Sequence, residues 1–101
     1  MKKIYIFDVD GTICRTKDGK YRQSKPIKKR IKKVNELFDK GNTIIFFTSR
    51  GKLTNIDWSK LTNYQFKKWK VKHHDIIFGK PYGDVYVGDE ALSDKEFFKF
   101  K

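Results

Sequence analysis

The chain has 101 residues, a length that fits one domain and leaves no room for a substantial second one. Hydrophobic residues make up 38% of the chain and aromatic residues 16%, enough for a modest core. The single cysteine, Cys14, excludes an intramolecular disulfide, and no apolar stretch approaches the roughly 18 residues that span a bilayer. The N-terminus lacks the apolar core and cleavage site of a signal peptide, so we expect a cytoplasmic protein that does not bind a membrane.

The net charge is +12, from 24 basic and 12 acidic residues. Ten of the basic residues lie between Arg15 and Lys33, where only Asp18 opposes them. One interpretation is a surface that attracts nucleic acid or another polyanion, or a phosphorylated substrate. The other is a solvated face rich in lysine, which is the more frequent cause of such a run.

The first half of the chain predicts a strand, a hairpin and a helix. Residues 3–8 hold four successive apolar residues, typical of a strand buried on both faces. Residues 13–22 predict a hairpin, because Asp18-Gly19 favours a two-residue turn. An apolar stripe from Ile27 to Phe38 then predicts a helix, with Ser24 as its cap, Pro26 in its first turn and Gly41 at its end.

In the second half, strands and helices continue to alternate. We expect strands at 43–47, 76–78 and 85–87, a helix over about 56–70, and a closing helix over 93–100. This alternation predicts an α/β fold with a mostly parallel sheet and right-handed crossovers.

Polar residues follow the predicted strands at their ends. Asp8 and Asp10 end the first strand, and side chains two apart on a strand point to the same side. Two like charges held close repel one another, and a hard divalent cation usually relieves this repulsion. The other strands are followed by Thr48, by Lys80, and by Asp89 with Asp94. Open α/β sheets place their ligands at this edge.

This ordered set resembles the motifs of the haloacid-dehalogenase-like (HAD) phosphohydrolases. Asp8-Val9-Asp10-Gly11-Thr12 matches the first motif, Thr48 the second, Lys80 the third, and Gly88-Asp89 with Asp94 the acidic fourth. The resemblance covers essentially the whole chain. It implies a single domain over 1–101 with a three-layer Rossmann-like core and a small β-hairpin flap after the first strand.

Within this superfamily the chain is most similar to short, capless phosphatases of capsule and other surface-polysaccharide biosynthesis. The segments Thr48-Ser49-Arg50-Gly51 and Phe78-Gly79-Lys80-Pro81 carry this similarity. Many of those proteins have a double aspartate where this chain has Gly88-Asp89. Asp89 is therefore the expected metal ligand of that motif.

The resemblance implies a role for each motif. Asp8 is the nucleophile, Asp10 the general acid and base, Lys80 a fixed positive charge, and Thr48 with the Ser49 N–H a grip on the phosphoryl oxygens. Magnesium (Mg²⁺) is the implied cofactor, held by the Asp8 carboxylate, the Asp10 backbone carbonyl and Asp89. Further phosphate- or substrate-binding candidates are Gly11, Thr12 and Arg50, and the candidate supporting positions are Asp84 and Asp94. Each of these residues could instead have a purely structural role: Arg50 in a surface ion pair, Asp84 at the start of a strand, and Asp94 as a helix cap.

No cap domain is expected, because only the short hairpin and a plain crossover interrupt the core. An open site can accept a large phosphorylated molecule or be covered by another subunit. The subgroup resemblance implies a small phosphorylated sugar or polyol as substrate. Three alternatives stay open: a phosphatase of nucleic-acid ends that uses the Arg15–Lys33 stretch, a non-catalytic basic binding module, and phosphotransfer to an acceptor other than water.

Overall fold

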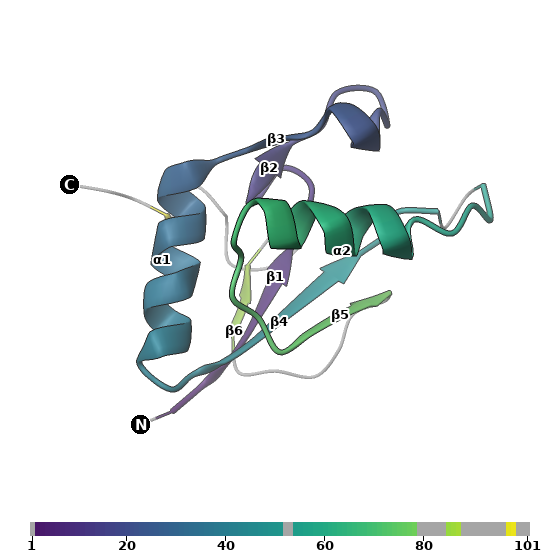
Figure 1. Ribbon diagram of the computed structural model, residues 1–101. Coiled ribbons are helices and arrows are strands. Elements are labelled where there is room, and N and C mark those ends of the chain that lie inside the picture. The colour runs from purple at the N-terminus through teal and green to yellow at the C-terminus, as the bar shows by residue number, and fades with distance from the viewer. Residues whose placement is uncertain (1, 52–53, 79–84, 88–96, 99–101) are drawn as a thin grey trace.

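The computed structural model describes residues 2–51, 54–78, 85–87 and 97–98 (Figure 1). It is a small α/β structure built on a parallel four-stranded sheet with the strand order β5-β4-β1-β6. The strands are β1 (Ile4–Asp8), β4 (Thr43–Thr48), β5 (Asp75–Phe78) and β6 (Val85–Val87). The helices are α1 (Lys28–Asp39) and α2 (Ser59–Lys68). The predicted parallel sheet and strand–helix alternation are therefore confirmed.

The first strand lies in the middle of the sheet. Phe7 of β1 is in register with Phe46 of β4 on one side and with Val87 of β6 on the other. A strand paired on both sides and covered by a core needs apolar side chains, which explains the run Ile4–Phe7. The residues that follow β1 consequently emerge at the centre of the sheet edge.

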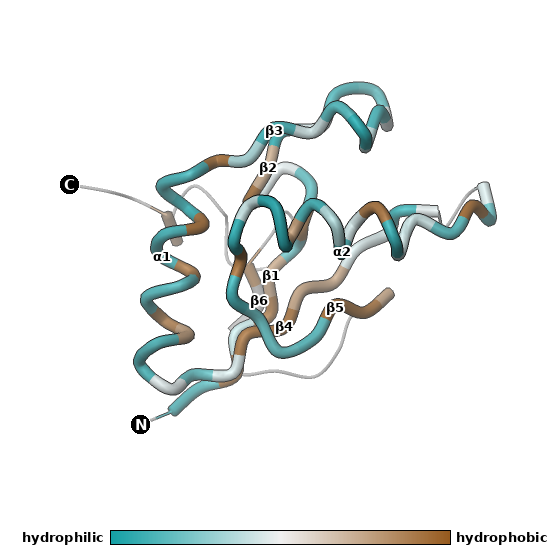
Figure 2. The backbone as a smooth tube through the Cα atoms, in the orientation of Figure 1, coloured by the Kyte–Doolittle hydropathy of each residue, from teal (hydrophilic) through white to brown (hydrophobic). Residues whose placement is uncertain are grey.

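The main core lies between one face of the sheet and both described helices. The ring centroid of Phe46 is 5.5 Å from that of Phe7 and 4.8 Å from that of Phe66 in α2. Ile31 and Val34 of α1 belong to the same buried cluster. Figure 2 shows the hydrophobic residues concentrated in β1 and β4 and recurring along α1. Since side chains alternate along a strand, the buried Ile6 belongs to the opposite face of the sheet.

Both described helices end in the same way. After α1, Gly41 adopts φ +93°, and its N–H and that of Asn42 bind the carbonyls of Phe38 and Leu37. These two bonds form a Schellman motif, so the predicted helix end at Gly41 is confirmed. The same motif ends α2, with Lys70 at φ 58° in the position that glycine usually takes.

The start of α1 differs from the prediction. The helix begins at Lys28, its N-cap is Ile27, and no side chain caps it. Pro26 lies instead in β3 (Lys25–Pro26), which pairs antiparallel with β2 (Cys14–Arg15). Proline has no backbone N–H, and it fits both an edge strand and a first helical turn because neither position requires that N–H to donate a hydrogen bond within the element.

The flap between β1 and α1 contains the predicted turn but not the predicted strand pairing. Asp18 and Gly19 both have positive φ, 52° and 68°, and the Lys20 N–H binds the Lys17 carbonyl. The expected return strand at 20–22 is mostly a 3₁₀ turn, η1 (Tyr21–Gln23), and the pairing occurs further out at β3. The Tyr21 ring of η1 packs edge-on against the Trp58 ring, with the ring centroids 5.1 Å apart.

Candidate active site

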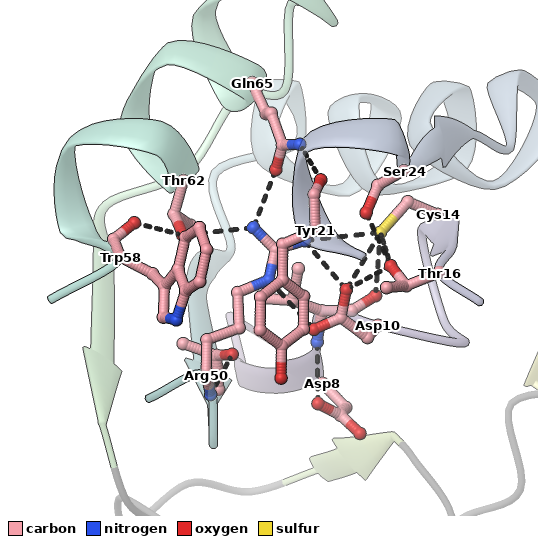
Figure 3. A network of polar contacts seen from close by, with 12 residues as sticks. Asp8, Asp10, Cys14, Thr16, Tyr21, Ser24, Arg50, Trp58, Thr62 and Gln65 are labelled. Carbon is pink, nitrogen blue, oxygen red and sulfur yellow. Dashed lines mark hydrogen bonds and ion pairs between the residues drawn. The ribbon is translucent and has the colours of Figure 1, made fainter. Parts of the chain in front are cut away.

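Asp8 is the last residue of β1 and lies at the centre of the carboxyl edge of the sheet. It is in register with Phe47 of β4, and its Oδ1 accepts a hydrogen bond from the Val9 N–H at 2.8 Å. The side chain is half-buried. In Figure 3 it points away from the network of polar contacts described below.

Asp10 lies beyond the strand. It takes part only in an isolated bridge with Cys14, and Gly11 then turns the chain with φ +84°. Because β1 ends at Asp8, the strand alternation from which Asp8 and Asp10 were expected to project to the same side does not extend to Asp10. The Asp10 carboxylate points into the polar network (Figure 3).

Arg50 holds the Asp10 carboxylate by a two-pronged ion pair. Its Nε donates to Asp10 Oδ2 at 2.9 Å and its Nη2 donates to Asp10 Oδ1 at 2.7 Å. The Thr16 hydroxyl also donates to Asp10 Oδ1, at 2.5 Å. Such a fork-to-carboxylate arrangement fixes orientation as well as charge.

Every N–H of the Arg50 guanidinium has an acceptor. Besides Asp10, Nη1 donates to Thr62 Oγ1 at 3.1 Å and to Gln65 Oε1 at 2.7 Å, and Nη2 reaches the Cys14 sulfur at 3.9 Å. The Tyr21 ring lies over the guanidinium with its centroid 4.8 Å away. Arg50 is only 2% exposed, so the surface ion pair considered from the sequence is wrong. No N–H of this guanidinium is left to bind a phosphate in this arrangement.

The network joins three segments that are distant in the sequence. Gln65 of α2 accepts from Arg50 and donates through its Nε2 to the Tyr21 carbonyl of the flap at 2.6 Å. The loop after β1, the flap and α2 are thereby connected through Arg50. Sequence reasoning missed Thr16, Tyr21, Thr62 and Gln65. The one available signal was a glutamine at a buried position of the α2 stripe.

Two ionisation equilibria are shifted here. Burial raises the pKa of Asp10, but hydrogen bonds from Arg50 and Thr16 and the charge of Arg50 outweigh it, so the pKa lies below its usual range. Burial, together with the charge of Asp10, raises the pKa of the Cys14 thiol to about 12. Cys14 is consequently a packed thiol and not a thiolate.

The turn after β4 carries the second predicted motif. Thr48 is buried at the end of β4, and its Oγ1 accepts from the Arg50 N–H at 3.1 Å, while Ser49 is exposed. Gly51 has φ +84°, and a Cβ there would lie 2.1 Å from the Ile56 carbonyl oxygen. The structure therefore requires glycine at this position. Thr48 and Asp8 end neighbouring parallel strands, as predicted.

The loop after Asp10 is tied to α1. Arg30 Nη1 donates to the Thr12 carbonyl at 3.0 Å and, more weakly, to the Gly11 carbonyl at 3.4 Å. Thr12 is buried and its N–H binds the Val9 carbonyl at 3.2 Å. Gly11 and Thr12 are thus parts of a fixed turn between Asp8 and the flap.

The remaining predicted site residues, Lys80, Asp84, Asp89 and Asp94, lie outside the described residues. Within the described ranges, no cluster of three or more His, Cys, Asp or Glu residues could hold a metal ion. The Asp8 carboxylate and the Asp10 backbone carbonyl are oxygen donors of the kind that Mg²⁺ prefers. The Asp10 side chain is already engaged by Arg50, so only the Asp10 backbone carbonyl could serve as a ligand in this arrangement.

One solved structure is closely similar to the whole chain. The crystal structure of an MCSG target from Vibrio cholerae aligns with a TM-score of 0.78 and 27% sequence identity, covering 100% of this chain and 90% of that chain. That protein is named only as a target, so the likeness supports the α/β fold and not an activity. No protein-family model and no curated protein matches the chain. Among the described helices, none has the length and apolar character needed to cross a membrane.

Proposed function

We propose that the chain is a phosphomonoester hydrolase that acts through an aspartyl-phosphate formed on Asp8. The observation that carries this proposal is the position of Asp8 at the end of the central parallel strand, beside Thr48 at the end of the neighbouring strand. This is the edge at which open α/β sheets bind ligands. The proposed core is of the HAD type, with the flap between β1 and α1 and no cap domain.

In the proposed reaction, an Asp8 carboxylate oxygen attacks phosphorus and the bond from phosphorus to the substrate oxygen breaks. The leaving oxygen takes up a proton, and water then attacks the phosphorus of the aspartyl-phosphate, loses a proton and restores Asp8. Asp10 is the proposed acid and base in these proton transfers, which requires its carboxylate, ionised and held by Arg50 in this structure, to turn from that pair toward the substrate. Bound Mg²⁺ would supply positive charge that offsets the repulsion between the carboxylate and the phosphate.

Arg50 was expected from the sequence to bind phosphate or substrate, but we propose a different role for it. Because its guanidinium is buried and all its donors are engaged, we assign it to positioning the Asp10 carboxylate. The phosphoryl oxygens would then be bound by Thr48, the Ser49 N–H and Lys80. We propose a small phosphorylated sugar or polyol as the substrate.

The test is phosphate release with and without magnesium over sugar phosphates, polyol phosphates, nucleotides and phosphate-ended oligonucleotides. Asp8→Asn is the matched control, because asparagine keeps an oxygen that can accept from the Val9 N–H. We expect magnesium-dependent turnover that the variant lacks. Turnover retained in Asp8→Asn, or none from folded wild-type protein on any member of the panel, would refute the proposal.

A second candidate function is the removal of phosphate from nucleic-acid ends. It is favoured by one observation, a lysine-lined groove between α1 and the end of α2. The same panel separates the two candidates, because turnover on oligonucleotides should weaken steeply with salt and turnover on sugar phosphates should not.

A further inference from the structure

A groove runs between the two helices on the helical side of the molecule. Its volume is about 750 Å³, and it is lined by Lys28 and Lys32 of α1 and by Lys68, Trp69 and Lys70 at the end of α2. We call this feature the α1–α2 groove. Figure 1 shows the C-terminal end of α2 directed toward α1.

The two walls are held together by side-chain contacts. Asn35 of α1 donates through Nδ2 to the Lys70 carbonyl at 2.9 Å, and its Oδ1 accepts from the Lys72 N–H at 2.8 Å. Ile31, only 5% exposed, lies among the lining residues and belongs to the core cluster. The groove is therefore part of the packed structure and not a gap between mobile side chains.

The charge of the groove is positive. All four of its lysines are exposed, whereas its acids are Glu36 and Asp39, and Asp39 is already paired with Lys72 at 2.7 Å. The neighbouring flap and α1 add further lysine and arginine between residues 15 and 33. A partner that fits this surface carries negative charge.

An aromatic side chain distinguishes the groove from a merely basic face. Trp69 packs against the core cluster, and its exposed part lies between two exposed lysines, Lys68 and Lys70. An indole next to cations is the combination that binds single-stranded nucleic acid, because bases stack on the ring while phosphates contact the cations. A duplex keeps its bases stacked inside and has no base to offer to Trp69.

We propose that the α1–α2 groove binds single-stranded nucleic acid, with its lysines contacting phosphates and Trp69 stacking on a base. This binding activity goes beyond the proposed phosphatase reaction and does not depend on it. The Asp8 carboxylate and the magnesium ligands play no part in it.

The test is fluorescence anisotropy of a labelled oligothymidylate of about 12 nucleotides over a salt series. The groove variant is Lys32→Gln with Lys68→Gln. The matched control is Lys3→Gln with Lys60→Gln, which removes the same charge from exposed positions outside the lining residues and outside the basic stretch 15–33. If each groove lysine contacts one phosphate, losing two contacts should flatten the log–log salt slope by about 1.4 and weaken binding about 25-fold at 0.1 M salt. The control should bind nearly as tightly as the wild type.

A second variant tests the aromatic wall. Trp69→Leu should weaken binding by roughly 5- to 150-fold, the range for losing one base–aromatic stack, with the salt slope unchanged. A thermal melt checks that this variant folds, and the lysine variants keep the proposal testable if it does not. Three results would overturn the proposal: no binding by the wild type, equal loss in the control and groove variants, or equal affinity for duplex DNA or heparin. Absence of phosphatase turnover would affect none of these outcomes.

Discussion

Replacing Arg50 with methionine should destabilise the protein much more than breaking an exposed ion pair does. The substitution removes the guanidinium that pairs with the Asp10 carboxylate. It also removes the N–H groups that donate to Thr62 Oγ1 and Gln65 Oε1. Breaking a buried pair in this way costs about 3–5 kcal/mol. The Asp10 side chain keeps 27% of its surface exposed, so we expect the lower end of that range, about 3 kcal/mol. For a domain of this size, that loss lowers the melting temperature by about 12–24 °C.

The assay is urea unfolding followed by tryptophan fluorescence, which is sensitive to the network because Trp58 packs against Tyr21. Lys72→Met is the matched control. The Lys72–Asp39 pair has the same 2.7 Å separation as Arg50–Asp10, but its side chains are 49% and 56% exposed. Removing an exposed pair costs about 0–1 kcal/mol. Similar losses in Arg50→Met and Lys72→Met would refute the reasoning, because burial would then not determine the value of the pair.

Arg50→Lys separates charge from geometry. Lysine keeps the positive charge but has only three donors and cannot form the planar two-pronged contact. Its stability should lie between those of the wild type and Arg50→Met. A wild-type value would show that charge alone holds Asp10.

Three further predictions concern backbone, pH and thiol chemistry. Gly19→Ala, at φ +68° in open space, should cost about 1–2 kcal/mol, and Gly51→Ala should cost more, because its Cβ would lie 2.1 Å from the Ile56 carbonyl oxygen; urea unfolding measures both. The lowered pKa of Asp10 contributes stability that is complete above about pH 4 and is lost as pH falls through the folded-state pKa. Acid titration of stability should therefore be shallower in Arg50→Met. The buried Cys14 thiol, with its pKa raised to about 12, should resist alkylation by iodoacetamide at about pH 8 in the folded protein and react after unfolding. Full labelling of the native protein would contradict the burial of this thiol.

The sheet was predictable from sequence because its determinants are local. Each strand is a short apolar run, and the helix end at Gly41 depends on one residue that tolerates φ +93°. Asp8 and Thr48 could be placed at one sheet edge because the carboxyl ends of parallel strands meet there. These inferences required no knowledge of which side chains touch.

The interior of the site was not predictable, because it depends on contacts between distant residues. Asp10 and Arg50 are 40 positions apart, and no local pattern distinguishes a buried arginine from an exposed one. The Ser24 and Pro26 signal was ambiguous for another reason. Proline suits a first helical turn and an edge strand equally, and the pairing of Pro26 with Cys14 decided between them.

Substituting Asp8 and substituting Asp10 should both reduce turnover but should change the stability of the protein to different extents. Asp10→Asn removes the charge that balances buried Arg50, so it should lower stability by about 3–5 kcal/mol as well as turnover. Asp8→Asn keeps an acceptor for the Val9 N–H and leaves the Arg50–Asp10 pair in place, so it should abolish turnover and lower stability less than Asp10→Asn does. Urea unfolding and phosphate release, measured on the same two preparations, test both statements. An Asp10→Asn protein as stable as the wild type would show that Arg50 finds other partners. An Asp8→Asn protein that unfolds would show that Asp8 holds the loop together, and its loss of activity would then no longer identify the nucleophile.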